Sequence, residues 1–166
     1  MTCMRRRCAA ALAATAMLVV CACGFRLAGS QPLPPALARP YLSVKDPYTD
    51  FAREFELQLK SSGALLAPSR QDSSATIEVT KDLVEQRTLA VSSTNIPTDY
   101  ELIYTVTFAV RGADKELLAP LTISVTKDYS FQVNELLAKE HESDQLRVGM
   151  ARDLVAIAMR RLTRLK

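Results

Sequence analysis

Hydrophobic and polar residues alternate in three stretches of the central chain, and each stretch predicts a β-strand. The clearest spans Tyr100–Arg111, with the larger apolar residues on one face: Tyr100, Leu102, Tyr104, Val106, Phe108 and Val110. After a turn at positions 112–115, alternation resumes with Leu121, Ile123, Val125, Tyr129 and Phe131 on one face. The opposite faces are polar and rich in threonine, including Thr105 and Thr107. This pattern predicts an antiparallel meander with one buried and one polar face.

The first of the three stretches, Thr76–Val91, is long and irregular. Ile77, Val79, Leu83, Leu89 and Val91 share one parity, but charged residues interrupt it at positions 81, 85 and 87. We expect a bent or bulged strand that runs past the edge of the helices covering it. A further short strand is predicted at Tyr41–Val44.

Two segments have the 3.6-residue periodicity of amphipathic helices. The first is expected to begin at Asp46-Pro47, with the aspartate as N-cap, and to end at Gly63; its apolar face is Phe51, Ala52, Phe55 and Leu59. The second carries the apolar stripe Met150, Ala151, Leu154, Val155, Ile157, Ala158 and Leu162. Its basic end (Arg160, Arg161, Arg164, Lys166) complements the helix dipole, the alternative being a membrane or phosphate patch.

The N-terminus follows a different pattern. Arg5–Arg7 precede a short, alanine-rich apolar run that ends in Val20-Cys21-Ala22-Cys23, a sequence that resembles a bacterial lipobox. We expect residues 1–22 to be a lipoprotein signal peptide, with cleavage before Cys23 and lipidation of Cys23. A permanent N-terminal anchor helix is the alternative, although the run is short for a bilayer span. Residues 23–39 then predict a proline-rich tether, and residues 40–166 a single domain.

Charge and cysteine content change on processing. The whole chain has 21 Lys and Arg against 18 Asp and Glu, and three of the arginines belong to the signal. The mature protein is therefore formally neutral, which disfavours nucleic acid as a partner. All four cysteines lie at or before position 23, so no disulfide framework remains.

Candidate chemistry is sparse. His141, the single histidine, stands in a charged stretch, and no second histidine or mature cysteine pair is present to form a metal site. No serine has a nucleophile-elbow pattern, and no glycine-rich phosphate loop occurs. These observations predict a binding protein with no catalytic residues, no metal and no cofactor.

Several short motifs, in order along the chain, resemble the lipopolysaccharide-assembly lipoprotein LptE family. They are Cys23-Gly24-Phe25-Arg26-Leu27, Pro32-Leu33-Pro34, Asp46-Pro47-Tyr48, Asp99-Tyr100-Glu101-Leu102, Leu136-Leu137-Ala138-Lys139-Glu140 and Arg160-Arg161-Leu162. The resemblance implies an α+β fold with two helices packed on one face of a four-stranded, mostly antiparallel sheet, a two-layer sandwich. The alternation and helical periodicity independently favour the same fold.

The resemblance also implies a role. Proteins of this family plug the LptD β-barrel and help deliver lipopolysaccharide to the outer leaflet, from the periplasmic side of the outer membrane. The family's lipopolysaccharide-contacting lysine falls on Lys139, whereas its second basic position falls near Ser93. Arg87 and Lys127 are therefore the candidates for cations near Lys139. Two alternatives are a lipoprotein auxiliary of another lipid-transport or barrel-assembly machine and a stand-alone lipid carrier.

Overall fold

The structure, a computed structural model, describes residues 32–130 and 136–165, with side chains described for residues 32–130 and 143–165. The elements follow in the order η1 (Pro35–Leu37), β1 (Pro40–Ser43), α2 (Asp50–Ser61), β2 (Ala75–Val91), β3 (Pro97–Arg111), β4 (Glu116–Ser130) and α3 (Leu136–Leu162). Cys23, the predicted lipidation site, and Phe131 lie outside the described residues.

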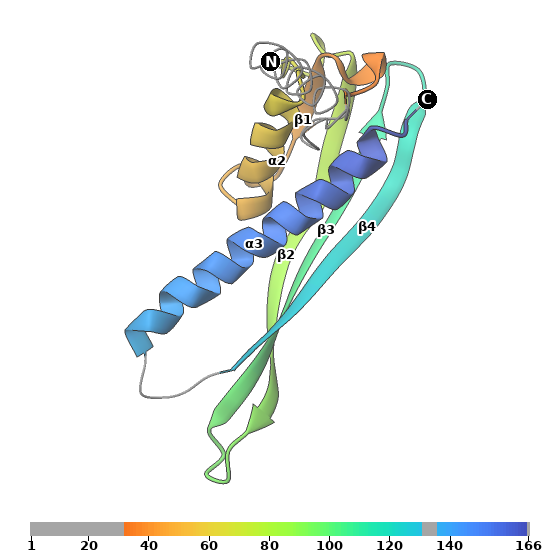
Figure 1. Cartoon of the computed structure of the whole chain (residues 1–166). Helices are drawn as coiled ribbons and strands as arrows, with labels where there is room; N and C mark the ends of the chain where they lie inside the picture. Colours follow the sequence, from red (N-terminus) through yellow and green to blue (C-terminus); the bar gives the residue numbers. More distant parts are fainter. Residues whose placement is uncertain (1–31, 131–135, 166) are drawn as a thin grey trace, which may run out of the picture.

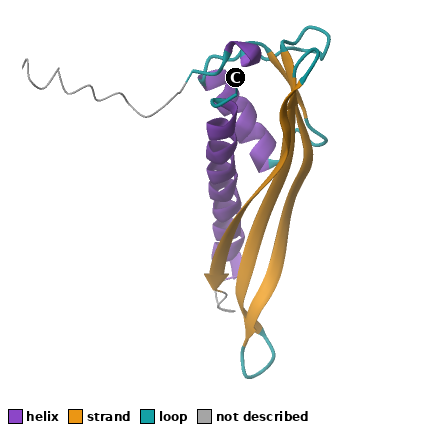
Figure 2. Cartoon of the chain, turned by 90° about the vertical axis from the view of Figure 1, so that its right-hand side faces the viewer, coloured by secondary structure: helices purple, strands orange, loops and turns teal. Residues whose placement is uncertain are grey.

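The four strands form one sheet in the order β1-β2-β3-β4. The short β1 is parallel to the start of β2, whereas β2, β3 and β4 pair antiparallel, as the alternation predicts. Both α2 and α3 lie on the same face of the sheet, and the other face has no helix over it (Figures 1 and 2). The prediction of a two-layer α+β fold with a mostly antiparallel sheet is confirmed.

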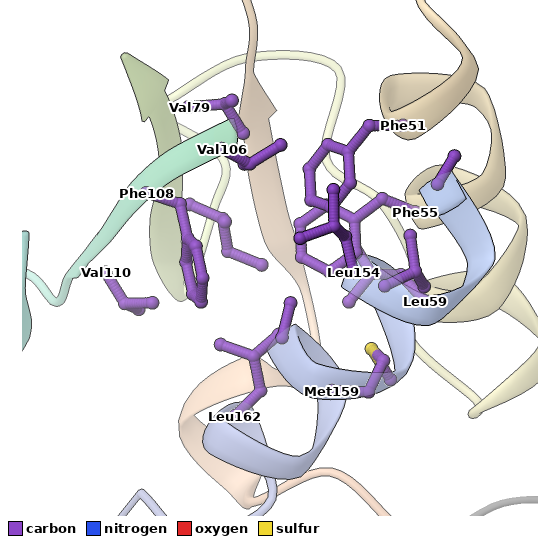
Figure 3. Close-up of a cluster of buried hydrophobic side chains, with 14 of the residues drawn as sticks. Phe51, Phe55, Leu59, Val79, Val106, Phe108, Val110, Leu154, Met159 and Leu162 are labelled. Atoms are coloured by element: carbon purple, nitrogen blue, oxygen red, sulfur yellow. The ribbon is translucent and has the colours of Figure 1, made fainter. Parts of the chain in front are cut away.

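The core fills the space between the two helices and the covered face of the sheet. Phe51 and Phe55 of α2 stack with ring centroids 5.1 Å apart, and Phe55 packs against Phe108 of β3 at 6.4 Å. Leu154 and Leu162 of α3 are fully buried in the same cluster (Figure 3). Burial of such side chains is worth about 1.5–3 kcal/mol each, so this cluster is the main source of stability.

Helix α2 begins at Asp50, three residues later than predicted, with Thr49 instead of Asp46 as its N-cap. The Thr49 hydroxyl accepts a hydrogen bond from the Ala52 N–H at 3.1 Å. Asp46 instead accepts from the Tyr48 N–H at 2.8 Å, which is a local turn. The prediction of Asp46 as the N-cap is therefore wrong. The predicted end is confirmed, since Gly63 has φ of +90° just after the last turn.

The register of β2 explains its irregular pattern. Val79 pairs with Phe108 but Lys81 pairs with Thr107, so an extra residue, Thr80, bulges at this point. Beyond the bulge the side chains change faces, because successive residues of a strand point to opposite sides. The expectation that Leu83 shares the buried face is therefore wrong: it lies in register with Thr105 on the open face and is 42% exposed.

The sheet extends beyond its helical cover. The β2–β3 hairpin projects past the start of α3, with its turn at residues 92–96 (Figure 1). Tyr104, Val106 and Phe108 are buried as predicted, but Tyr100 is only half-buried, because it stands on this projecting part. There it stacks on Tyr129 of β4, with ring centroids 5.4 Å apart.

Part of the predicted tether belongs to the folded domain. Leu37, in η1, is fully buried and joins the core cluster, and Leu33 packs against that cluster. The Ser74 hydroxyl donates to the Ala36 carbonyl at 2.8 Å and accepts from the Arg39 N–H at 3.1 Å. The folded core therefore begins several residues before the boundary expected at residue 40.

Candidate functional site

The open face of the sheet is a polar surface to which β2, β3 and β4 all contribute. Register places its residues in rows across β2, β3 and β4: Lys81–Thr107–Thr122, Leu83–Thr105–Ser124, Glu85–Ile103–Thr126 and Arg87–Glu101–Asp128. The Thr107 and Thr122 hydroxyls are hydrogen-bonded to each other at 2.8 Å. This face offers hydroxyls and mixed charges, with Leu83 and Ile103 as its apolar members, so it suits a polar partner surface rather than a hydrocarbon phase.

A groove lies on the opposite side of the sheet, between β4 and α3. Its volume is about 560 Å³, and its walls are Lys127, Gln145, Leu146, Gly149, Met150, Arg152 and Asp153. Lys127 is in register with Leu102 and therefore points to the helix side of the sheet. The groove combines cations at its edge with an apolar floor, which fits an amphipathic anion.

Gly149 marks this groove and was missed in the sequence analysis. A side chain there would meet nothing within 4 Å, so neither packing nor backbone conformation requires glycine. Glycine inside a helix costs about 1 kcal/mol relative to alanine, and it leaves the helix backbone open to close approach. The sequence did contain a signal for this groove, which is a glycine inside the predicted helix, directly before the first residue of its apolar stripe.

The structure separates the candidate ligand residues. Lys127 lines the groove, but Arg87 lies in register with Glu101 on the open face, so the two cations point to opposite sides of the sheet. Lys139 belongs to the first turns of α3, and its side chain lies outside the described part of the chain. A joint site can thus include Lys127 and the start of α3, whereas Arg87 belongs to the other surface.

A buried polar network joins α2 to the sheet next to the β2 bulge. The Phe51 N–H donates to the Tyr104 hydroxyl oxygen at 3.1 Å, and the Thr49 hydroxyl donates to the Asp82 carboxylate at 2.5 Å. Burial, and then the nearby Asp82 carboxylate to which the phenol donates, raise the pKa of Tyr104 well above its ordinary value. The bulge turns Asp82 toward the helices, and this network fixes where α2 starts on the sheet.

The described residues hold neither a metal-binding cluster nor a membrane-spanning helix. Among residues 32–130 and 143–165, no group of three or more His, Cys, Asp and Glu side chains is arranged to hold a metal ion. Neither of the described helices combines the length and the apolar character needed to cross a bilayer.

Comparison with known families gives one clear match. The family model described as "LptE: Lipopolysaccharide-assembly" matches residues 39–162, which include every described strand and helix from β1 to α3.

Individual relatives agree with the family match. The chain is 28% identical to the LPS-assembly lipoprotein LptE of Yersinia enterocolitica over 149 residues, which cover 89% of this chain and 71% of that protein. It is 27% identical to the LPS-assembly lipoprotein LptE of Yersinia pestis over 161 residues, covering 96% and 77%.

Solved structures show the same fold. An uncharacterized lipoprotein B from Nitrosomonas europaea superposes with a TM-score of 0.68 at 25% identity, covering 84% of this chain and 90% of that one. The rare lipoprotein B from Shewanella oneidensis gives a TM-score of 0.59 at 28% identity, covering 73% and 92%.

Proposed function

The chain belongs to the LptE family of lipopolysaccharide-assembly lipoproteins, and on that premise we propose that it plugs an LptD-like β-barrel and helps deliver lipopolysaccharide to the outer leaflet. In this proposal it is an outer-membrane lipoprotein on the periplasmic side, held by acyl chains on Cys23. It acts by binding and has no catalytic role.

The observation that supports the plug role is the open face of the sheet. Polar rows run along it from the Thr107 row to the Arg87 row, without a helix over them. The lumen of an outer-membrane barrel is itself polar, so a hydroxyl-rich face can exchange hydrogen bonds with it without burying unpaired groups. An enclosed lipid carrier would instead need a large apolar cavity, whereas this core is filled by Phe51, Phe55, Phe108 and their neighbours.

The proposal also includes direct contact between this protein and lipopolysaccharide. Lys127, with Lys139 from the start of α3, would meet phosphate groups, while Leu146 and Met150 would lie under an acyl chain. Arg87 would contact ligand or barrel from the open face. The rival function is a lipoprotein auxiliary of another lipid-transport or barrel-assembly machine, which would bind a periplasmic partner.

Co-purification from outer membranes tests the plug role. The wild-type protein is expected to bring a large barrel protein with it in equal amount. Ser124→Arg places a bulky cation on the open face, beside Thr105 on the edge strand β4, and is expected to abolish that recovery. Ala156→Arg is the matched control, because Ala156 is exposed on the outer side of α3. Recovery of a periplasmic partner and no barrel would favour the rival function.

Intact-mass spectrometry of the membrane-extracted protein tests the anchor. The expected mature N-terminus is Cys23 with acyl chains attached. A mature N-terminus at Cys21, or an unmodified Cys23, would contradict the anchoring.

A further inference from the structure

Positive charge gathers at one end of the domain, the end where β1, β2 and β4 begin and where α3 ends (Figure 1). Each of these cations is exposed: Arg39, Arg70, Arg111, Lys115, Arg160, Arg161 and Arg164. They outnumber the carboxylates there, which are Asp72, Glu78, Asp114 and Glu116. We call this surface the cationic end.

The opposite end has the reverse balance. On the projecting part of the hairpin and the end of β4, the carboxylates are Glu85, Asp99, Glu101 and Asp128. The cations there are Arg87 and Lys127. The mature chain is formally neutral, yet the fold separates its charges along the long axis of the sheet.

Intramolecular needs explain only part of the cationic end. The dipole of α3 accounts for Arg160, Arg161 and Arg164 in or beside its last turn. It does not account for Arg39 or Lys115, which belong to other elements. Within the described residues, Arg111 is the one member with an ion-pair partner, Glu78 at 3.3 Å. The other cations are free to meet an external anionic surface.

A recess at this end has the size and groups for a phosphate. It lies between the segment before β2 and the β3–β4 turn, has a volume of about 390 Å³, and is lined in part by Arg70, Ser73, Thr76 and Arg111. Guanidinium groups are donors that phosphate oxygens accept from readily, and Thr76 adds a hydroxyl. The Ser73 hydroxyl already donates to the Arg70 carbonyl at 2.7 Å.

The position of the N-terminus indicates which anionic surface this is. The first described segment, which contains η1, lies at the cationic end, where the Ser74 hydroxyl just before β2 bonds to the Ala36 carbonyl and the Arg39 N–H. Nine residues from Cys23 to Pro32 span at most about 30 Å, whereas the 15-residue β3 carries the hairpin tip about 50 Å further along. We propose that the cationic end lies against the anionic headgroups of glycerophospholipids in the leaflet that holds the anchor. This inference rests on the proposed acylation of Cys23. Membrane binding then has two contributions, one from the acyl chains and one from the basic residues.

Energy transfer from the protein to the membrane surface tests this arrangement. The acylated chain is incorporated into phosphatidylcholine vesicles, with or without phosphatidylglycerol, that carry an acceptor dye on their headgroups. A donor is attached at Ala113→Cys, in the β3–β4 turn, or at Ser93→Cys, at the hairpin tip. Transfer from position 113 is expected to be high with phosphatidylglycerol, and to fall without it or at high salt. Transfer from position 93 is expected to stay low throughout.

Charge-neutralising pairs locate the contact. One pair is Arg161→Gln with Arg164→Gln, and the other is Arg39→Gln with Lys115→Gln. Each substitution is expected to lower the equilibrium constant for contact between position 113 and the headgroups about fivefold. The second pair does not touch α3, so a change in helix stability cannot explain its effect. Lys45→Gln with Arg53→Gln, exposed positions away from this end, is the matched control and is expected to leave energy transfer unchanged. Among the described residues, Arg53 pairs only with Asp50 of its own helix, at 2.7 Å.

Two negative results have different meanings. Anchored protein whose position 113 approaches neutral and anionic vesicles equally, or whose control pair weakens transfer as much as the others, would overturn the headgroup contact. Wild-type protein that fails to remain with vesicles of either composition would overturn the acyl anchoring itself.

Discussion

The two ends of β3 have the same alternating pattern and very different surroundings. At one end Phe108 and Val110 are fully buried under α2 and α3, and their neighbours on β2, Ile77 and Val79, are buried with them. At the other end the aliphatic residues around the β2–β3 turn remain in solvent: Leu89 is 53% exposed and Val91 52%. Strand alternation shows which side chains share a face, but burial depends on whether another element lies over that face.

The difference suggests that one end of the domain provides stability and the other provides binding surfaces. The covered end supplies the free energy of folding, and the projecting end has polar rows on one face and the Lys127 groove on the other. Helix α3 shows the same division, because none of its described side chains from residue 143 to residue 149 is fully buried, whereas Met150 is. Sites for partners are expected where packing makes few demands on the sequence.

The largest expected effect is loss of packing at the covered end. Phe108→Ala should lower the free energy of unfolding by about 3–5 kcal/mol, because it leaves a cavity against Phe55. Leu89→Ala, on the projecting hairpin, should change it by no more than about 0.5 kcal/mol. Urea unfolding of both variants measures the contrast. Equal losses would mean that the hairpin contributes to the core as much as the covered end does.

A smaller effect is expected at the junction between the two ends. Tyr104→Phe removes a buried hydroxyl and leaves the Phe51 N–H without its acceptor, which should cost about 1–3 kcal/mol. Tyr129→Phe, at the half-buried stack of the projecting end, is the matched control and should cost less. Chemical denaturation at neutral pH compares them, and a larger loss from Tyr129→Phe would contradict the comparison.

Alkaline pH should act through the same tyrosine. Burial and the Asp82 carboxylate raise the pKa of Tyr104 above its ordinary value near 10, so the unfolded chain releases this proton first as the pH rises. The contribution of protonated Tyr104 to the free energy of unfolding is complete below pH ~10 and is lost as the pH rises above it. Burial and Tyr100 also raise the pKa of Tyr129, but this side chain is more exposed, so its contribution is expected to be smaller.

Urea denaturation midpoints between pH 8 and pH 11 measure how steeply stability falls as the pH rises. Tyr104→Phe should flatten this slope, whereas Tyr48→Phe, at a side chain that is 81% exposed, should leave it unchanged. A slope that survives Tyr104→Phe would assign the alkaline sensitivity to another group.

The smallest expected effect concerns the ligand. Lys139→Asp should weaken lipopolysaccharide binding by a few-fold, about 1 kcal/mol, and wild-type affinity should fall as salt rises, since the contact is between solvated charges. Lys60→Asp on α2 is a matched control, although Lys60 pairs with Glu56 at 2.6 Å, so its fold stability is measured alongside. If Lys139→Asp matches wild type at all salt concentrations, the protein acts as a plug without a direct lipid contact at this residue.

The sequence determined the elements, the faces of β3 and of the two helices, and the family. Alternation in β3 assigned Leu102, Tyr104, Val106 and Phe108 to one face, because the pleat of a strand admits no other arrangement of neighbouring side chains. The 3.6-residue period did the same for the two helices. Family motifs spread along the chain identified the fold and the role in lipopolysaccharide assembly.

Tertiary structure decided what local pattern leaves open. The choice of Thr49 over Asp46 as the α2 cap depends on contact with Asp82, and Asp82 faces the helices only because of the bulge at Thr80. The separation of Arg87 from Lys127 follows from strand register, and the cationic end arises because residues distant in sequence meet where the strands begin and α3 ends. These features depend on long-range pairing, which sequence periodicity does not encode, since it records only the relation of each residue to its near neighbours along the chain.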